Sequence, residues 1–208
     1  MTIPPEAARQ LEAWGVSRET FPRLAAYVDL LLRWNGRINL IGRGTAADVW
    51  SRHVLDSAQL LPLLPSGARR VVDLGSGAGF PGLVLAISGV PEVLLIDSDQ
   101  RKCAFLREAA RVAAAPVTIS ASRIEEAPGF EADIITARAL APLSRLLEHA
   151  EKYLGPNSRC LFLKGRSAAE ELTEAAKLWS MRARLLPSVT DEAAAIVCIE
   201  NPAREHRA

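Results

Sequence analysis

The sequence has no long hydrophobic run. No stretch reaches the roughly 20 consecutive apolar residues that a helix needs to cross a bilayer. The first ten residues contain two prolines and an acid, which is unlike a secretory signal peptide. From these absences we expect a cytoplasmic protein without a membrane-bound segment.

Cysteine is scarce, with three residues in the whole chain. Cys103, Cys160 and Cys198 are widely separated, form no Cys-x-x-Cys pair and have no histidine at a spacing typical of metal ligands. The pattern argues against a disulfide framework and against a zinc motif. We expect three buried thiols and no bound metal.

An excess of one charge is also missing, because 25 basic residues face 24 acidic ones and the net charge is +1. The overall charge therefore gives no support for a nucleic-acid partner. Locally, residues 33–53 contain four arginines and one acid, and residues 136–166 contain six basic residues and two acids. Such patches suit a phosphate backbone, but solvated surface arginines would give the same pattern, so charge leaves both interpretations open.

The N-terminal part of the chain is predicted to be helical. Apolar residues recur at three- and four-residue spacing over residues 21–35, after a potential helix cap at Thr20. A second helix is expected over about residues 48–61, before a proline-rich linker. We therefore expect residues 1–66 to form a helical extension packed on the core.

The rest of the chain alternates between strands and helices. The predicted strands are Val71–Leu74, Val93–Asp97, Val117–Ala121, Asp133–Thr136, Arg159–Lys164, Leu185–Val189 and Ala195–Glu200. This rhythm is typical of an α/β fold with a mostly parallel, doubly wound sheet, and the last two strands can pair as an antiparallel hairpin. With 49% apolar residues in the chain, residues 67–208 can form one globular unit.

The most informative stretch runs from Val71 to Gly82, where an apolar strand breaks into a glycine-rich turn that opens a helix. Two cofactor patterns compete there. The dinucleotide pattern G-x-G-x-x-G fits only if it begins at Gly77, two residues late after the strand. The better fit starts at the strand end and is typical of methyltransferases that use S-adenosylmethionine (SAM); its residues are Asp73, Gly75, Ser76, Gly77 and Gly79.

A second acid follows the next predicted strand. Asp97 lies 24 residues after Asp73 and ends the apolar run Val93–Ile96. A carboxylate at this strand end can accept both hydroxyls of a ribose. The alternative is that Asp97, like Asp99, only caps the helix that follows.

Further motifs occur in order along the chain. They are Trp34-Asn35 with Asn39-Leu40, Arg52-His53-Val54-Leu55-Asp56-Ser57, residues 73–82, Leu95-Ile96-Asp97-Ser98, Arg101-Lys102 with Phe105-Leu106, Ser122-Arg123-Ile124-Glu125-Glu126, Arg138-Ala139 and Leu163-Lys164-Gly165. This ordered set resembles the RsmG (GidB) family of bacterial methyltransferases, which modify N7 of a guanine in 16S ribosomal RNA.

The resemblance implies a Rossmann-like class I SAM-dependent methyltransferase fold with seven strands. It also implies SAM as cofactor, S-adenosylhomocysteine as product, and 16S ribosomal RNA or the small ribosomal subunit as partner. Separately from the resemblance, we expect a monomer without a metal. Implied cofactor contacts are Gly75, Phe80, Ile124, Glu125 and Arg138. Our own candidates for RNA contacts are the basic residues Arg52, His53, Arg101, Arg123, Arg138, Lys164 and Arg166.

One departure from the family pattern precedes the last predicted strand. Family members often carry an Arg-His pair there, whereas this chain has Ala193-Ala194-Ala195. If that pair helps to hold RNA in the family, this chain must hold RNA with other residues.

The sequence also narrows the methyl acceptor. Amino-group methyltransferases acting on adenine or cytosine typically place an Asn/Asp-Pro-Pro-aromatic motif after the fourth strand, where this chain has residues 136–142 without such a motif. Carbon-5 methylation needs a cysteine nucleophile, but the three cysteines fall in a predicted helix and two predicted strands. Guanine N7 carries no proton and offers a lone pair, so we expect catalysis by placement, without a catalytic residue.

Other functions remain open at this stage. The same cofactor would also serve a methyltransferase acting on a small molecule or a protein. A ribosome-assembly factor without enzyme activity could retain the fold and bind RNA. A dinucleotide-linked oxidoreductase is the weakest alternative, because the glycine pattern for it begins late.

Overall fold

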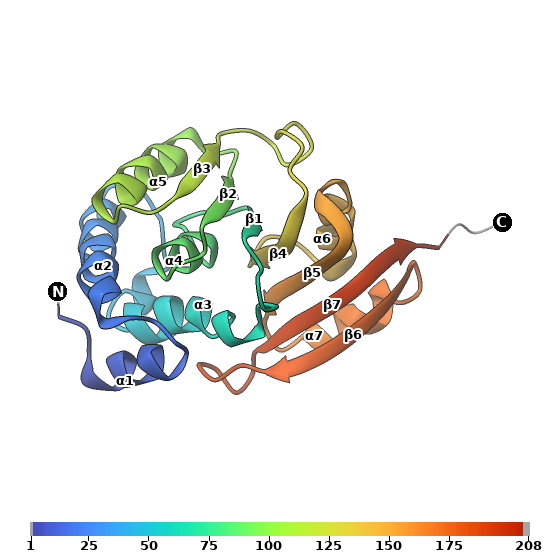
Figure 1. The fold of residues 1–208 in the computed structure, drawn as a ribbon, viewed down its shortest axis with the longest axis horizontal. Helices are drawn as coiled ribbons and strands as arrows, with labels where there is room; N and C mark the ends of the chain where they lie inside the picture. The colour runs from blue at the N-terminus through green and yellow to red at the C-terminus, as the bar shows by residue number, and fades with distance from the viewer. Residues whose placement is uncertain (1, 206–208) are drawn as a thin grey trace.

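The computed structural model of the protein describes residues 2–205 and contains a seven-stranded sheet (Figure 1). The strand order is β3-β2-β1-β4-β5-β7-β6. The strands are β1 Arg70–Leu74, β2 Glu92–Ile96, β3 Val117–Ser120, β4 Ala132–Arg138, β5 Leu154–Lys164, β6 Trp179–Pro187 and β7 Ala195–Arg204. Strands β1 to β5 pair in parallel, while β5-β7 and β7-β6 are antiparallel. The structure confirms the predicted mostly parallel sheet with its terminal hairpin.

Helices cover both faces of this sheet. One face carries α1 Pro5–Ala13, α2 Phe21–Asn35, α3 Asp56–Ala58, α4 Gly82–Ile87 and α5 Gln100–Val112. The other carries α6 Leu143–Ala150 and α7 Ala168–Ala175 (Figure 1). Because both faces are covered, the central strands are almost continuously apolar: Val71 packs toward the first layer, and Val72 and Leu74 pack toward the second.

The chain changes direction across the sheet between β1 and β4. It runs from β1 outward to β2 and β3 and then returns to form β4 on the other side of β1. In open α/β sheets, the crevice at the carboxyl ends of the strands beside such a reversal is the usual ligand site. The fold therefore points to the ends of β1, β2 and β4.

The N-terminal segment shares its core with the sheet. Leu24, Tyr27 and Val54 are fully buried in the same apolar cluster as Leu83 and Phe105. The Tyr27 hydroxyl also donates a 2.6 Å hydrogen bond to the carbonyl of Ala78. The extension is thus packed against the α4–α5 side of the sheet.

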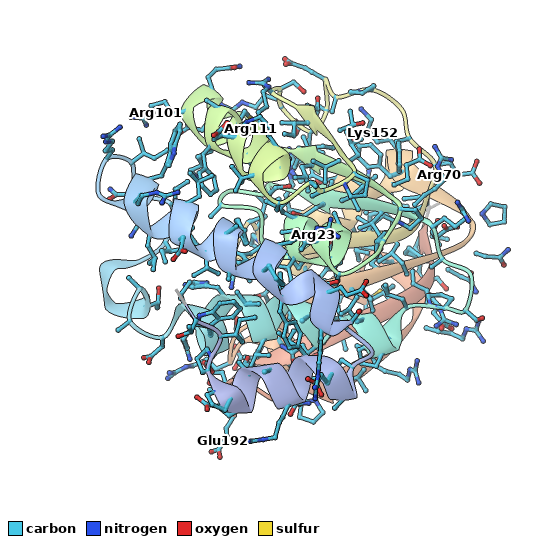
Figure 2. All side chains as sticks on the ribbon, turned by 60° about the vertical axis from the view of Figure 1, so that its left-hand side comes forward. Arg23, Arg70, Arg101, Arg111, Lys152 and Glu192 are labelled. Carbon is cyan, nitrogen blue, oxygen red and sulfur yellow. The ribbon has the colours of Figure 1, made fainter. Side chains whose placement is uncertain are left out.

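Polar contacts fix the same packing between α2 and α5. Arg23 of α2 donates to the carbonyls of Ala113 and Ala114, at 2.7 and 2.8 Å, just after α5 ends (Figure 2). The predicted helical extension, residues 1–66, and the predicted globular unit, residues 67–208, each include residues outside the described range: residue 1 and residues 206–208. Among the helices of residues 2–205, none has both the length and the apolar character to span a bilayer.

Two helix predictions need correction. Thr20 does not cap α2 with its side chain: it is the last residue of a 3-10 turn with helical backbone angles, and Ser17 makes the cap bond to Glu19 N instead. The helix expected over residues 48–61 is not a regular α-helix. It consists of a π-helical segment, Trp50–Leu55, then α3, and then a 3-10 turn, Leu61–Leu63.

The cysteines behave as predicted. Cys103, Cys160 and Cys198 are free and buried. Burial raises the pKa of the Cys160 thiol well above its usual value, so this group stays protonated.

Candidate functional site

The glycine-rich loop follows the last residue of β1, Leu74, and leads into α4 at Gly82. Gly75, Gly77 and Gly79 have φ angles of +67°, +57° and +98°, a region that L side chains rarely adopt. The amide of Ser76 donates a 2.9 Å hydrogen bond to the carbonyl of Ile96 at the end of β2. The loop is therefore fastened to the neighbouring strand and leaves its backbone close to the crevice.

Asp73 connects β4 to the end of this loop by hydrogen bonds of its side chain. Its side chain is fully buried and accepts hydrogen bonds from Thr136 Oγ1 of β4, at 2.7 Å, and from the amide of Gly82, at 3.2 Å. Burial raises the pKa of the Asp73 carboxyl to about 6, against the lowering effect of these bonds. The Asp73 carboxylate is thus hydrogen-bonded within the protein, and Asp73 lines neither of the two pockets described below. A direct contact between Asp73 and a cofactor stays a prediction.

The first of these pockets, the β2 pocket, lies at the carboxyl end of β2 and has a volume of about 430 Å³. It is lined by Gly75, Ile96, Asp97, Ser98, Asp99, Lys102, Ser122, Arg123, Ile124, Glu125, Ala139, Leu140, Arg145 and His149. The predicted contacts Gly75, Asp97, Ile124 and Glu125 therefore share one cavity. Its size is typical of small-molecule sites.

The Asp97 carboxylate is held in a fixed orientation in this pocket. Oδ2 accepts from the amide of Gly77 at 2.7 Å, and Oδ1 accepts from the amide of Asp99 at 2.8 Å. Each oxygen retains a further lone pair that can accept another donor. Two adjacent hydroxyls of a ligand are one set of donors that these oxygens can accept. Asp99, not Asp97, caps α5 by accepting from the amides of Arg101 and Lys102.

The second cavity, the β4 pocket, lies beyond the ends of β4 and β5 and also has a volume of about 430 Å³. Its lining includes four residues from the predicted RNA-contact set: Arg52, His53, Arg138 and Lys164. It also includes Ser188, Thr190, Asp191 and Ala194 of the β6–β7 turn and Ala195, the first residue of β7. The pocket is thus built by four regions that are far apart in the sequence: residues 40–56, 138–139, 163–171 and 188–195.

Ion pairs line the β4 pocket. Arg138 bonds to Asp56 at 3.2 Å, Arg52 bonds to Asp191 at 2.9 Å, and Lys164 bonds to Glu171 at 2.6 Å. Arg52 and Asp56 are four residues apart on one helical segment, yet each forms its ion pair with a residue from a distant segment. Lys164 is only 10% exposed.

His53 is buried and uncharged. Burial, followed by the nearby charges of Arg138 and Arg52, lowers the pKa of His53 to about 3. Its Nε2 lies 2.8 Å from Thr45 Oγ1, and its ring stacks on Phe80 with a centroid distance of 5.0 Å. A neutral ring in this position gives no charge to a phosphate.

Phe80 lies inside the protein and not on a pocket wall. Its side chain is buried, contacts the Tyr27 ring at a centroid distance of 5.6 Å, and carries the Arg138 guanidinium at 4.8 Å from the ring centroid. Neither pocket includes Phe80 in its lining. The contact between Phe80 and a cofactor stays a prediction.

Ala139 joins the two pockets, since it lines both. Ala139 has a φ of +51°, and the next residue, Leu140, folds back over the glycine loop. Leu140 is 39% exposed although it is apolar. A ligand that extends from one pocket to the other must pass this short segment.

Three other predicted residues are exposed around the pockets. Arg123 lines the β2 pocket, while Arg101 and Arg166 belong to neither lining. Arg101 lies at the start of α5, at the surface, with its guanidinium 3.4 Å from Asp99 (Figure 2). Of these three arginines, Arg123 alone lines one of the two pockets.

Several lining residues were not predicted. In the β2 pocket these include Lys102, Leu140 and Arg145, and in the β4 pocket Thr190 and Asp191. No local pattern marks Thr190 or Asp191, because they reach the pocket only through the folding of the hairpin. Leu140 could have been suspected from its place directly after a strand end at the crevice.

Comparison with protein families gives one match that covers most of the chain. A family model described as rRNA small subunit methyltransferase G (GidB) matches residues 20–195. The Paramagnetospirillum magneticum protein named ribosomal RNA small subunit methyltransferase G is 57% identical over 190 residues, which are 91% of this chain and 93% of the relative. The protein of the same name from Rhodospirillum centenum is 60% identical over 185 residues, 89% and 86% of the two chains.

Solved structures share the fold at low sequence identity. A putative O-methyltransferase from Klebsiella pneumoniae superimposes with a TM-score of 0.58 at 16% identity, over 84% of this chain and 90% of that chain. TYW2 from M. jannaschii, solved in complex with AdoMet, gives a TM-score of 0.54 at 14% identity, over 82% and 80%. At these identities the likeness concerns the fold alone.

Proposed function

The chain belongs to the ribosomal RNA small subunit methyltransferase G family, and from this premise we propose that it transfers a methyl group from SAM to N7 of a guanine in 16S ribosomal RNA. The observation that carries the proposal is the β2 pocket. It combines a glycine loop at the reversal of strand order with a carboxylate aligned for two hydroxyls.

The residues of the β2 pocket fit a SAM molecule. Asp97 would accept the two ribose hydroxyls, while Ile124 and Glu125 would border the adenine. Gly75 and Gly77 would let the methionine part lie close to the backbone. When bound, SAM supplies a methyl group on a positively charged sulfur, and S-adenosylhomocysteine is the product. We propose that no metal takes part.

The acceptor guanine would enter the β4 pocket, on the other side of Ala139. This pocket adjoins the β2 pocket through that residue, which is the relation that in-line methyl transfer between two ligands needs. Orientation of reactants can lower a barrier by roughly 7–11 kcal/mol. A target in an RNA loop can be presented single-stranded, with its base splayed out of the stack.

Catalysis by placement agrees with the two titratable groups nearest to the loop. His53 is held neutral by its lowered pKa, and its Nε2 is occupied by Thr45. Asp73 is buried beneath the loop, with both oxygens hydrogen-bonded. Guanine N7 has no proton to lose, so neither group is needed as a general base.

We propose that RNA phosphates contact the exposed arginines around the crevice: Arg52, Arg101, Arg123 and Arg166. Lys164, Arg138 and His53 were also expected to contact RNA, but their ion pairs and burial favour a role inside the β4 pocket. The enzyme would act as a monomer in the cytoplasm, on naked RNA or the small ribosomal subunit. Residues 1–66 and 67–208 would work as one unit, which their shared core supports.

The test is methyl transfer from labelled SAM to unmodified small-subunit RNA, offered naked and as assembled subunits. Nucleoside digestion and mass spectrometry should then find 7-methylguanosine. Label in RNase-resistant material would instead favour the alternative of a small-molecule or protein acceptor. RNA binding that is indifferent to SAM, without transfer, would favour an assembly factor.

A further inference from the structure

The carboxylate of Asp56 joins three separate segments at the β4 pocket. Oδ2 accepts from Nη1 of Arg138, at 3.2 Å, at the end of β4. Oδ1 accepts from Gln59 Nε2 at 3.0 Å and from Thr190 Oγ1 at 2.9 Å, and Thr190 belongs to the β6–β7 turn. All three donors surround one side chain, so its orientation is fully determined.

The Asp56–Arg138 pair is shielded from solvent. The two side chains are only 15% and 19% exposed, whereas the Arg52–Asp191 pair in the same pocket is 46% and 35% exposed. A shielded pair is screened less by salt than a surface pair, and removing one partner leaves the other charge poorly compensated. Asp56 therefore constrains Arg138 more strongly than a surface carboxylate would.

Arg138 is held on two further sides. Its Nη1 also donates to the carbonyl of Arg52 at 3.2 Å, and its guanidinium lies 4.8 Å over the Phe80 ring. Among the residues that the structure describes, no hydrogen bond uses Nη2 or Nε of Arg138. A fixed guanidinium with a free edge is suited to bind a carboxylate through two parallel bonds.

We propose that Asp56 is a positioning residue that holds Arg138 so that its free donors bind the carboxylate of the methionine part of SAM. The inference rests on the proposed function, since it concerns the same ligand. Arg138 lines the β4 pocket together with Ala139, and Ala139 also lines the β2 pocket. A ligand that extends from the β2 pocket past Ala139 therefore enters the cavity that Arg138 lines. An RNA phosphate would more readily meet the exposed arginines outside.

The experiment compares two ligands by isothermal titration calorimetry. S-adenosylhomocysteine carries the carboxylate, and 5′-methylthioadenosine keeps the adenosine but lacks the amino-acid part. In Arg138→Gln and in Asp56→Asn, we expect the Kd of S-adenosylhomocysteine to rise at least tenfold and that of methylthioadenosine to change less than twofold. In the double variant, S-adenosylhomocysteine should bind as in Arg138→Gln, within threefold, because Asp56 acts through Arg138.

Asp191→Asn is the matched control. It removes the side-chain pair between Arg52 and Asp191, which connects the same helical segment to the same hairpin turn. The bonds of Arg138 to Asp56 and to the Arg52 carbonyl do not involve Asp191. Both dissociation constants should stay within twofold of the wild type. Asp56→Glu should recover part of the loss for S-adenosylhomocysteine, since it restores the charge.

Equal weakening of both ligands in Asp56→Asn would overturn the proposal and assign Asp56 a general structural role. An unchanged Kd, or losses that add in the double variant, would overturn it as well. If Asp56→Asn does not fold, Thr190→Val removes one bond to Asp56 and should weaken S-adenosylhomocysteine selectively, by about threefold. These titrations use no RNA, so a failed methylation assay would not affect the inference about Asp56. A wild-type protein that binds neither ligand would overturn both this inference and the assignment of SAM as cofactor.

Discussion

Leu140 lies directly on Gly75: a Cβ placed on this glycine would be 2.6 Å from Cδ1 of Leu140. Both residues line the β2 pocket, as does Ala139. Because the clashing atom is the end of a flexible and partly exposed side chain, Leu140 can rotate away. The backbone angle of Gly75, with φ at +67°, cannot be relieved in this way.

We therefore expect Gly75→Ala to weaken S-adenosylhomocysteine binding at least tenfold while stability falls by only about 1–2 kcal/mol, the usual cost of a left-handed alanine. The added methyl group would occupy space beside the ligand, where the loop backbone must lie close. Calorimetry measures the first effect and urea unfolding the second.

The matched control for Gly75 is Gly67→Ala. Gly67 has a φ of +84°, a Cβ placed on it would have no neighbour within 4 Å, and it precedes β1 at the opposite edge of the sheet. It should lose similar stability and bind the ligand normally. If adding Leu140→Ala to Gly75→Ala restored binding, the defect would come from Leu140 alone and the close approach of ligand to loop would be wrong.

Asp97→Asn should weaken both S-adenosylhomocysteine and 5′-methylthioadenosine at least tenfold, because both ligands carry the ribose. The amide would also point an N–H group toward the amide of Gly77 or of Asp99, at a cost of about 1–3 kcal/mol in stability. Ligand titrations and urea unfolding separate the two effects.

Asp133→Asn controls for the loss of a backbone-binding carboxylate. Asp133 accepts from the amides of Arg69 and Arg70, at 2.8 and 2.9 Å, near the start of β1. Both amides donate to one oxygen, Oδ2, so an asparagine can keep both bonds. This variant should therefore lose less stability than Asp97→Asn and bind both ligands as the wild type does. Normal binding by Asp97→Asn would remove Asp97 from the ribose site.

The position of Asp97 could be predicted because it depends on local features. An apolar run gives a buried strand, and the parallel register of β1 with β2, including Leu74 opposite Ile96, brings the end of β2 beside the glycine loop. The buried role of Asp73 was harder to predict. Asp73 is two residues after Val71 and so faces the α4 layer, but the sequence does not show whether a ligand or Gly82 receives its carboxylate.

Other parts of the site depend on contacts between distant residues. Arg138 and Asp56 are 82 positions apart, and Thr190 is 134 positions from Asp56. No local pattern encodes such pairs. Similarly, the predicted strand at Leu185–Val189 is in fact the longer β6, Trp179–Pro187, because this edge strand alternates with exposed polar residues and lacks a continuous apolar run.

The Asp73 carboxyl should make stability depend on pH. Its folded pKa of about 6 lies above the usual 3.8, so the folded state binds this proton more tightly than the unfolded chain. Its contribution is therefore largest at low pH and is lost as pH rises through about 6. Relative to Asp73→Asn, the wild type should lose about 1–2 kcal/mol of unfolding free energy between pH 5 and pH 7.5.

Urea unfolding of both proteins at the two pH values measures this difference. The contribution of His53 to stability changes with pH in the opposite direction. Its pKa is lowered to about 3 in the folded protein, so below pH 6.5 the unfolded chain takes up a proton that the folded protein does not, and stability falls. His53 is present in both proteins, so its contribution cancels in the comparison. Asn is tolerated at Asp73, since the Thr136 hydroxyl already lies 3.4 Å from the carbonyl of Val72 and can donate there. Parallel pH profiles for the two proteins would contradict the assignment.

The salt dependence of RNA binding should distinguish the two exposed arginines, Arg123 and Arg166, from the largely buried Lys164. Arg123 and Arg166 are exposed and form no salt bridge within the described residues, so their charges are available to phosphates. Replacing either with glutamine should reduce the slope of log K against log salt concentration by about 0.7–1. Lys164 is instead bonded to Glu171 and to the carbonyl of Ala141, at 2.6 and 2.8 Å. Lys164→Gln should lower stability and leave the salt slope unchanged. The contrary result, a reduced slope in Lys164→Gln with unchanged slopes in the Arg123 and Arg166 variants, would mean that RNA phosphates bind in the β4 pocket instead.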